Sequence, residues 1–326
     1  MTSRRSVWLA GVGMLTLSRP AAAQQAERVW RIGWFATVDS FREPFSQAFV
    51  RRLQELGFVD GRNLKIEYRH AGGRLERMPE IAAELERLKP DVYFVGGSEA
   101  NLIALKAASR DTPIVVVATD YDPVVTGHVT NLARPGGRIT GVTPLQSVLP
   151  AKRLELLKEL LPSARRVAVF TTAGTVGQLK VTQEAARRLG LTLQVLEFKT
   201  EPFDYDAAFA DAVRGKSDVL MVLGSALFFP ARRRIPEMAA KAKLPTMFHH
   251  AQWADVGGLA SYGFSFSDMF RRAAEQVAAI LRGAKAGDIP MEQGSKFEMV
   301  INLRTARALG LTVPQSIMLR ADRVIE

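Results

Sequence analysis

The 326-residue sequence contains no cysteine and only four histidines. The absence of cysteine excludes structural disulfides, thiolate nucleophiles and thiolate-ligated zinc or iron sites. It also excludes the kind of lipid-anchored N-terminus that needs a cysteine at its cleavage site. His249 and His250 form the only histidine cluster. Neighbouring residues at a strand end point to opposite faces of the sheet, so we predict that this pair holds no metal.

Nucleotide-binding signatures are also missing. The sequence has no G-x-x-x-x-G-K-[ST] loop, and no G-x-G-x-x-G follows its first predicted strand. We therefore predict no cofactor. Basic residues are in excess but scattered: Lys and Arg number 44 against 33 Asp and Glu, and the densest run is only residues 232–234. Nucleic-acid binders concentrate their basic residues on one face and interleave aromatics, so nucleic acid is not an expected partner.

Long apolar stretches are confined to the N-terminus, and after Leu17 no window of about 18 residues is both apolar and uncharged. Residues 1–23 combine Arg4 and Arg5, an apolar stretch over 7–17 and three alanines before the expected cleavage point. This pattern is typical of a cleaved export signal. Three of the arginines lie within it, so the mature chain carries a charge of +8.

A buried N-terminal helix is the alternative interpretation, but Gly11, Gly13 and Pro20 disfavour a stable helix there. We therefore expect a soluble periplasmic protein with no lipid anchor. The two arginines leave the Sec and twin-arginine export routes open.

The rest of the chain alternates β-branched runs with amphipathic helical patterns. The first unit is a strand at residues 32–35 followed by a helix whose Phe45, Phe49 and Leu53 recur at helical spacing. Similar units continue to residue 118, and the alternation restarts after residues 139–142. It predicts two α/β halves with parallel sheets. The glycines and prolines of residues 135–144 suit a linker between them.

Short polar turns follow many of the predicted strands, at the sheet edge where open α/β folds bind ligands. Two such edges facing one another across a linker would form a cleft. These turns contain Thr37, Asp39, Ser40, Gly97, Ser98, Glu99, Thr119, Asp120, Thr172, Thr175, Gly224, Ser225, His249 and His250. For any single Ser or Thr among them, capping of the following helix is the alternative role.

A secreted hydrolase is the rival interpretation, with Ser98, Asp120 and His250 as its centre. Ser98 lies where a nucleophile elbow would, but Ala100 stands in place of the last glycine of G-x-S-x-G. Helix capping explains Ser98 better. We therefore assign no catalytic residue.

Four segments resemble the substrate-binding proteins of ABC importers, in the branch with tryptophan- and tyrosine-type binders. They are ELGFVDGRNLKIEYR (55–69), RPGGRITGV (134–142), INLRTARALGLTVP (301–314) and LRADRVIE (319–326). The resemblance implies a type I periplasmic-binding-protein fold, with two Rossmann-like lobes and three hinge crossovers. Lobe 1 would be residues 30–142 plus 265–293, and lobe 2 would be residues 143–264 plus 294–326. Gly141, Gly263 and Gly294 would lie near the hinges.

The resemblance further implies a monomer that captures a small organic ligand, amino-acid-like or aromatic, by hinge closure and delivers it to a permease served by a separate ATPase. Its contact with the inner membrane would be limited to that permease. The polar turns would hold the ligand, with Phe228 and Tyr262 as apolar walls. A periplasmic sensor that presents its closed form to a receptor is a second alternative.

Overall fold

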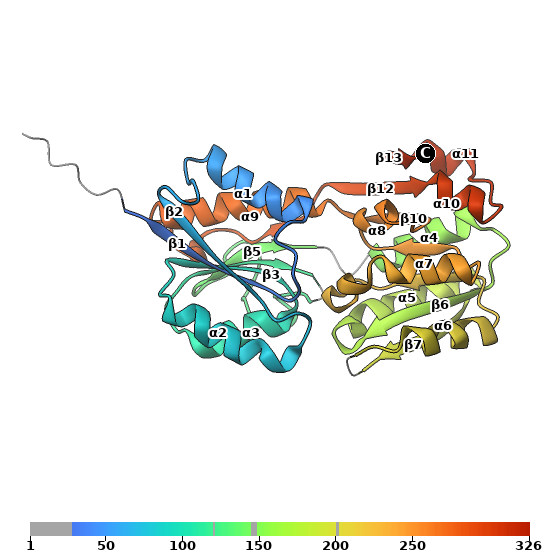
Figure 1. Cartoon of the computed structure of the whole chain (residues 1–326), viewed down its shortest axis with the longest axis horizontal. Coiled ribbons are helices and arrows are strands. Elements are labelled where there is room, and N and C mark those ends of the chain that lie inside the picture. Colours follow the sequence, from blue (N-terminus) through green and yellow to red (C-terminus); the bar gives the residue numbers. More distant parts are fainter. Residues whose placement is uncertain (1–27, 120, 145–148, 200–201) are drawn as a thin grey trace, which may run out of the picture.

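The computed structural model describes residues 28–119, 121–144, 149–199 and 202–326. Residues 1–23, the expected export signal, and Asp120 lie outside the described residues. Figure 1 shows two α/β lobes side by side along the long axis of the molecule, joined by extended segments.

Lobe 1 is built on a six-stranded sheet in the order β11-β5-β4-β3-β1-β2, whose paired strands all run parallel. Its strands are β1 (Trp30–Ala36), β2 (Leu64–His70), β3 (Val92–Gly97), β4 (Ile114–Ala118), β5 (Ile139–Thr143) and β11 (Glu292–Gln293). Its helices are α1 (Pro44–Glu55), α2 (Met78–Arg87), α3 (Glu99–Ala108) and α9 (Phe266–Leu281), with short 3-10 turns η1 (Leu75–Arg77) and η4 (Ala286–Asp288). Helices α1 and α9 cover one face, and α2 and α3 the other (Figure 1).

Lobe 2 contains a seven-stranded sheet in the order β13-β12-β10-β9-β8-β6-β7, parallel except for the antiparallel β10–β12 pair. Its strands are β6 (Arg166–Thr172), β7 (Thr192–Phe198), β8 (Val219–Val222), β9 (Thr246–Phe248), β10 (Ala260–Phe264), β12 (Phe297–Asn302) and β13 (Arg323–Ile325). Its helices are α4 (Leu149–Leu160), α5 (Val176–Leu189), α6 (Tyr205–Arg214), α7 (Arg234–Lys241), α8 (Gln252–Asp255), α10 (Leu303–Ala308) and α11 (Gln315–Met318), with 3-10 turns η2 (Ala173–Thr175) and η3 (Ala226–Ala231).

The chain passes between the two sheets after β5, after β10 and after β11. The crossing segments lie together, because the Gly294 amide donates to the Thr143 carbonyl at 3.0 Å and the Ser265 amide donates to the Lys296 carbonyl at 2.9 Å. The predicted fold of two α/β lobes is confirmed by this architecture. The residue limits of the two bodies stay a prediction, because they specify which residues would move together.

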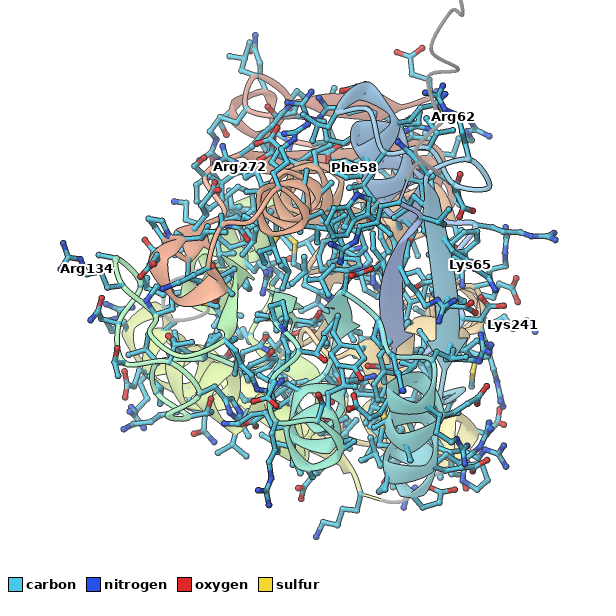
Figure 2. The ribbon with its side chains drawn as sticks, turned by 90° about the vertical axis from the view of Figure 1, so that its left-hand side faces the viewer. Phe58, Arg62, Lys65, Arg134, Lys241 and Arg272 are labelled. Atoms are coloured by element: carbon cyan, nitrogen blue, oxygen red, sulfur yellow. The ribbon has the colours of Figure 1, made fainter. Side chains whose placement is uncertain are left out.

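Charged side chains project from several sides of lobe 1. Figure 2 shows Arg62, Lys65 and Arg134 pointing outward in different directions. Many basic residues pair locally with acids, as Arg52 does with Glu275 at 2.8 Å. Such exposed pairs contribute little stability each.

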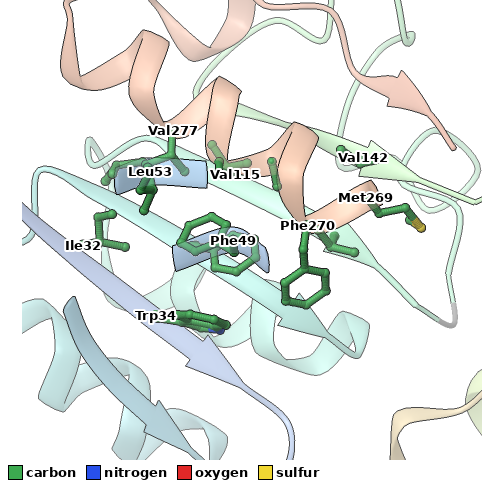
Figure 3. Packing of buried hydrophobic residues seen from close by; sticks show 14 of the residues in the cluster. Ile32, Trp34, Phe49, Leu53, Val115, Val142, Met269, Phe270 and Val277 are labelled. Carbon is green, nitrogen blue, oxygen red and sulfur yellow. The ribbon is translucent and has the colours of Figure 1, made fainter. Parts of the chain in front are cut away.

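The core of lobe 1 follows from the sequence periodicity. Phe49 and Leu53 of α1, fully buried, meet Phe270 and Val277 of α9 above the sheet (Figure 3). The rings of Phe49 and Phe94 stack at 4.0 Å. Parallel strands covered on both faces require continuous apolar runs, as in the fully buried strand β4. This packing fixes α9, and therefore its N-terminal phenylalanines, against the strand ends of lobe 1.

Candidate functional site

Both lobes contribute to a small cavity at the facing edges of their sheets. We call it the main cavity; its volume is about 50 Å³. The end of β3 and the loops after β1, β4, β8 and β9 reach it, which is where the carboxyl ends of parallel strands lie. It is lined by Thr37, Val38, Ser40, Phe45, Gly96, Gly97, Thr119, Ser225, Ala226, Phe229, His249, His250, Phe266 and Phe270.

A second pocket of about 20 Å³ adjoins the main cavity and shares three lining residues with it. We call it the hinge-side pocket, because Pro144 and Phe264 at its wall belong to the segments that cross between the lobes. Its lining residues are Thr119, Pro144, Leu149, Arg153, Gly224, His249, Phe264 and Phe266. The two spaces together form the candidate site.

Four phenylalanines give the main cavity its apolar wall. Phe45 of α1 packs edge-on against Phe229 of η3 at 6.0 Å, which joins the two lobes directly. Phe45 also lies 4.9 Å from Phe270 and 5.8 Å from Phe266 at the start of α9. Phenyl rings in such edge-to-face and tilted arrangements offer the contacts that aromatic ligands prefer.

On the lobe 1 side, Thr37 connects two loops. Its hydroxyl donates to the Asn101 side chain at 2.7 Å and accepts from the Ser98 amide at 2.9 Å. Gly97 permits this approach: it has a φ of +145°, and a Cβ there would lie 2.3 Å from the Thr37 hydroxyl oxygen. A glycine is therefore required at this wall of the cavity.

On the lobe 2 side, both histidines face the main cavity, with ring centroids 4.4 Å apart. The expectation that they point to opposite faces is wrong. Strand β9 ends at Phe248, so the strand alternation no longer applies to the bend that follows. The Trp253 indole donates to His250 Nε2 at 3.2 Å, which places the proton of the neutral ring on Nδ1.

Both imidazoles are neutral in this environment. Burial, with the charges of Arg153 and Arg232 adding to it, lowers the pKa of His250 to about 3. Burial and the neighbouring His250 and Arg153 also hold the pKa of His249 well below its ordinary value of 6.5. The pair can therefore donate and accept hydrogen bonds at neutral pH without carrying charge.

Arg153 is a buried cation beside this pair. Its side chain lies on α4 and lines the hinge-side pocket, with 3% of the residue exposed. Nε donates to the Tyr262 carbonyl at 2.7 Å, while Nη1 has no hydrogen-bond partner among the described residues. Burial lowers the pKa of Arg153 to about 9, so the guanidinium stays charged at neutral pH.

The sequence-predicted site residues divide among several places. Thr37, Ser40, Gly97, Thr119, Ser225, His249 and His250 line the main cavity, and Gly224 lines the hinge-side pocket. Ser98, Glu99 and Thr172 instead line a wide inter-lobe groove of about 640 Å³. There Ser98 caps α3 by accepting from the Ala100 amide at 3.1 Å, and Glu99 meets His128 at 2.8 Å.

The other predicted residues point elsewhere. Asp39 is exposed and accepts from the Tyr68 hydroxyl at 3.5 Å. Thr175 is buried, and its hydroxyl donates to the Thr172 carbonyl at 3.0 Å. Phe228 is fully buried in the core of lobe 2. Tyr262 stacks on Phe297 at 6.0 Å, beside a groove on lobe 2 rather than beside the main cavity.

The sequence did not identify Arg153, Phe45, Phe266 or Phe270 as site residues. A signal for Arg153 exists: in α4 it shares a helical face with Leu149, Leu156 and Leu160, so a cation occupies a core-facing position. Phe228 and Phe229 look equivalent in sequence: either could stack on an aromatic or apolar ligand, and at least one is expected in the core. Only the 3-10 turn of η3 directs Phe228 to the core and Phe229 to the cavity.

Within the described residues, no three acidic or histidine side chains gather closely enough to hold a metal ion. No helix of the described chain is both long and apolar enough to span a bilayer. Two of the three hydrolase candidates line different spaces, Ser98 the wide groove and His250 the main cavity, and Asp120 lies outside the described residues.

Two parallel-sheet lobes with a polar and aromatic cavity at their facing strand ends define a two-lobed ligand-binding protein. The family model for ABC transporter substrate binding proteins matches residues 39–325. The chain therefore belongs to that family, as the four sequence segments indicated.

Similar proteins agree with this assignment. A curated tyrosine-binding protein of Clostridioides difficile is 27% identical over 268 residues, covering 81% of this chain and 76% of the relative. A crystal structure of a conserved domain protein from Vibrio cholerae matches with a TM-score of 0.84 at 26% identity, over 91% of this chain and all of that one. The open, ligand-free structure of a substrate-binding protein with adhesive properties from Clostridium difficile gives a TM-score of 0.64 at 26% identity, over 91% of this chain and 99% of that one. The two clostridial relatives are named as binding proteins.

Proposed function

We propose that this chain is the periplasmic solute-binding protein of an ABC importer. It captures a small aromatic, amino-acid-like molecule between its lobes, performs no chemistry on it and delivers it to a permease driven by a separate ATPase. The observation that carries the proposal is the main cavity, where polar strand ends of both lobes and four phenyl rings meet in a chain of this family. The tyrosine-binding relative supports the class of ligand.

The small size of the main cavity supports a closed conformation. About 50 Å³ holds only a few water molecules, whereas sites that hold organic ligands measure about 300–1,000 Å³. We therefore propose that the lobes separate to admit a ligand to the main cavity. We propose that the three crossing segments act as the hinge.

Export and association complete the proposal. The N-terminal 23 residues carry the export pattern, and binding proteins of importers act outside the cytoplasm. We propose a monomer, because each chain contains both halves of its own cavity. The sensor alternative uses the same cavity and differs only in the receptor that reads the closed form.

A thermal-shift screen of the chain from Gln24 onward tests the proposal. A ligand that binds only the folded state raises the melting temperature. We expect stabilisation by at least one aromatic amino acid or related small organic molecule, and none by ATP, NAD or DNA. Titration calorimetry then gives the affinity. If a nucleotide stabilises the protein and no metabolite does, the binding-protein assignment is wrong.

A further inference from the structure

Arg153 is the most unusual charged group of the described chain. It is almost fully buried, and its cationic side chain is balanced by no carboxylate among the described residues that line the main cavity or the hinge-side pocket. A buried charge without a partner is costly, and proteins retain such groups where a ligand completes them. Nη1 is buried and unpaired within the described structure, so the guanidinium has an open donor.

A hydrogen bond at Nε sets the orientation of the guanidinium, and therefore of its unpaired Nη1. Nε is held by the Tyr262 carbonyl of β10 at 2.7 Å, so the guanidinium cannot swing away from the crossing segments. The guanidinium Nη2 lies 3.5 Å from the position a Cβ would take at Gly263. His249, also in the hinge-side pocket, has Nδ1 buried without a hydrogen-bond partner in the described chain.

We propose that the hinge-side pocket is an anion subsite in which Arg153, with His249 beside it, binds the carboxylate of the ligand. The planar guanidinium fork matches a carboxylate geometrically. The aromatic part of the same ligand lies in the main cavity among Phe45, Phe229, Phe266 and Phe270. The substrates are thus aromatic carboxylic acids, amino acids included. This inference rests on the proposed function, because it assigns the chemistry of that site.

The ligand arm of the test uses the intact mature protein and three related probes. L-Tryptophan, indole-3-propionate and tryptamine share an indole, but tryptamine lacks the carboxylate and indole-3-propionate lacks the amino group; the corresponding tyrosine series is run in parallel. Calorimetry is expected to show the amine binding on the order of 100-fold more weakly than the parent amino acid. Indole-3-propionate, which lacks the amino group, is expected to lose less affinity relative to tryptophan than tryptamine does.

The protein arm compares two arginine variants. Arg153→Met is expected to lose a similar factor of affinity for the carboxylate-bearing probe without lowering the melting temperature of the free protein, since it removes an unbalanced buried charge. Arg138→Met is the control: that half-buried guanidinium donates to the Thr112 and Ser109 carbonyls of lobe 1. The Arg138→Met substitution is expected to lower the melting temperature and leave the ligand affinity unchanged. A purely structural role for Arg153 would give the opposite pattern.

The outcomes separate the subsite from the proposed function. If an aromatic ligand binds but its amine binds equally well, or Arg153→Met binds as tightly as the wild type, the subsite is wrong and the binding function stands. The same conclusion follows if a wider screen finds only an uncharged or cationic ligand. If no small molecule binds at all, both proposals fail.

Discussion

At the scale of single residues, the site depends on charge states that burial sets. The two histidines of the main cavity are neutral, and the buried Arg153 beside them keeps its charge. A cavity of this kind favours a ligand that brings its own negative charge and an apolar body.

The histidine pair makes the stability of the protein depend on pH. In the unfolded chain an imidazole takes up a proton near pH 6.5, whereas in the folded protein the pKa of His250 is about 3 and that of His249 is also depressed. The unfolded state therefore binds more protons below pH 6.5, and stability falls as the pH is lowered through this window. Each histidine contributes about 1.4 kcal/mol per pH unit.

Urea denaturation at pH 7.5, 6 and 5 measures this loss. His250→Asn is expected to reduce the slope of unfolding free energy against pH by about one proton relative to the wild type. Equal slopes for the two proteins would show that His250 is not held neutral in the fold.

A substitution at Gly263 tests the close packing of β10 against His249. A Cβ at this position of β10 would lie 1.8 Å from the His249 carbonyl oxygen, too close for any side chain. Gly263→Ala is expected to cost on the order of 2 kcal/mol or more, because backbone must move to relieve the contact. Gly177→Ala, exposed in α5 with no atom within 4 Å of the added Cβ, is the control and is expected to be neutral or slightly stabilising. Thermal unfolding measures the stability of both variants. Equal losses of stability would contradict the close approach of residue 263 to the His249 carbonyl.

Several site residues could not be predicted from sequence at this scale. Asp39 and Ser40 lie side by side in one polar turn, yet Ser40 lines the cavity and Asp39 is exposed beside Tyr68. Which side of a turn a residue occupies depends on contacts with distant segments. The sequence therefore predicted that polar residues after the strands lie near the site, but not which way each side chain points.

At the scale of helices and strands, most of the architecture could be predicted. Parallel strands covered on both faces need apolar runs, and helices on those faces need a 3.6-residue period, so both leave patterns in the sequence. The last part of the chain was less predictable. Strand β13 and helix α11 are short and half-exposed, and β13 exists because it pairs with β12 in lobe 2.

An ion pair between elements of different lobes should favour closure. Glu43, immediately before α1, meets Arg232, immediately after η3, at 2.5 Å, and the same guanidinium lies 4.4 Å from the Phe229 ring centroid. Glu43→Gln is expected to weaken ligand affinity about two- to fivefold, because a partly exposed pair contributes up to about 1 kcal/mol. Calorimetry at low and high salt measures this, and the difference should shrink as salt screens the pair.

Asp206→Asn serves as its control, since it breaks an equally short pair with Arg234 inside lobe 2. Its affinity is expected to equal that of the wild type. If both variants lose affinity alike, the pair between the lobes has no special part in closure.

At the scale of the whole molecule, strand ends of the two sheets line one cavity, and three crossing segments join the lobes. The cavity belongs to neither lobe alone: Thr37 and Phe45 come from one side, Ser225 and Phe229 from the other. Separation of the lobes would therefore dismantle the site, and closure would rebuild it around a ligand. This geometry supports the proposed reversible capture.

Lobe motion can be measured directly because the chain has no cysteine of its own. Glu76→Cys in lobe 1 and Lys199→Cys in lobe 2 place two exposed labels on opposite walls of the wide groove. Single-molecule energy transfer between them, in the mature protein, is expected to show a low-transfer population that moves to high transfer as the stabilising ligand is added, and returns when it is removed. One unchanging population, with ligand bound and without, would contradict hinged capture.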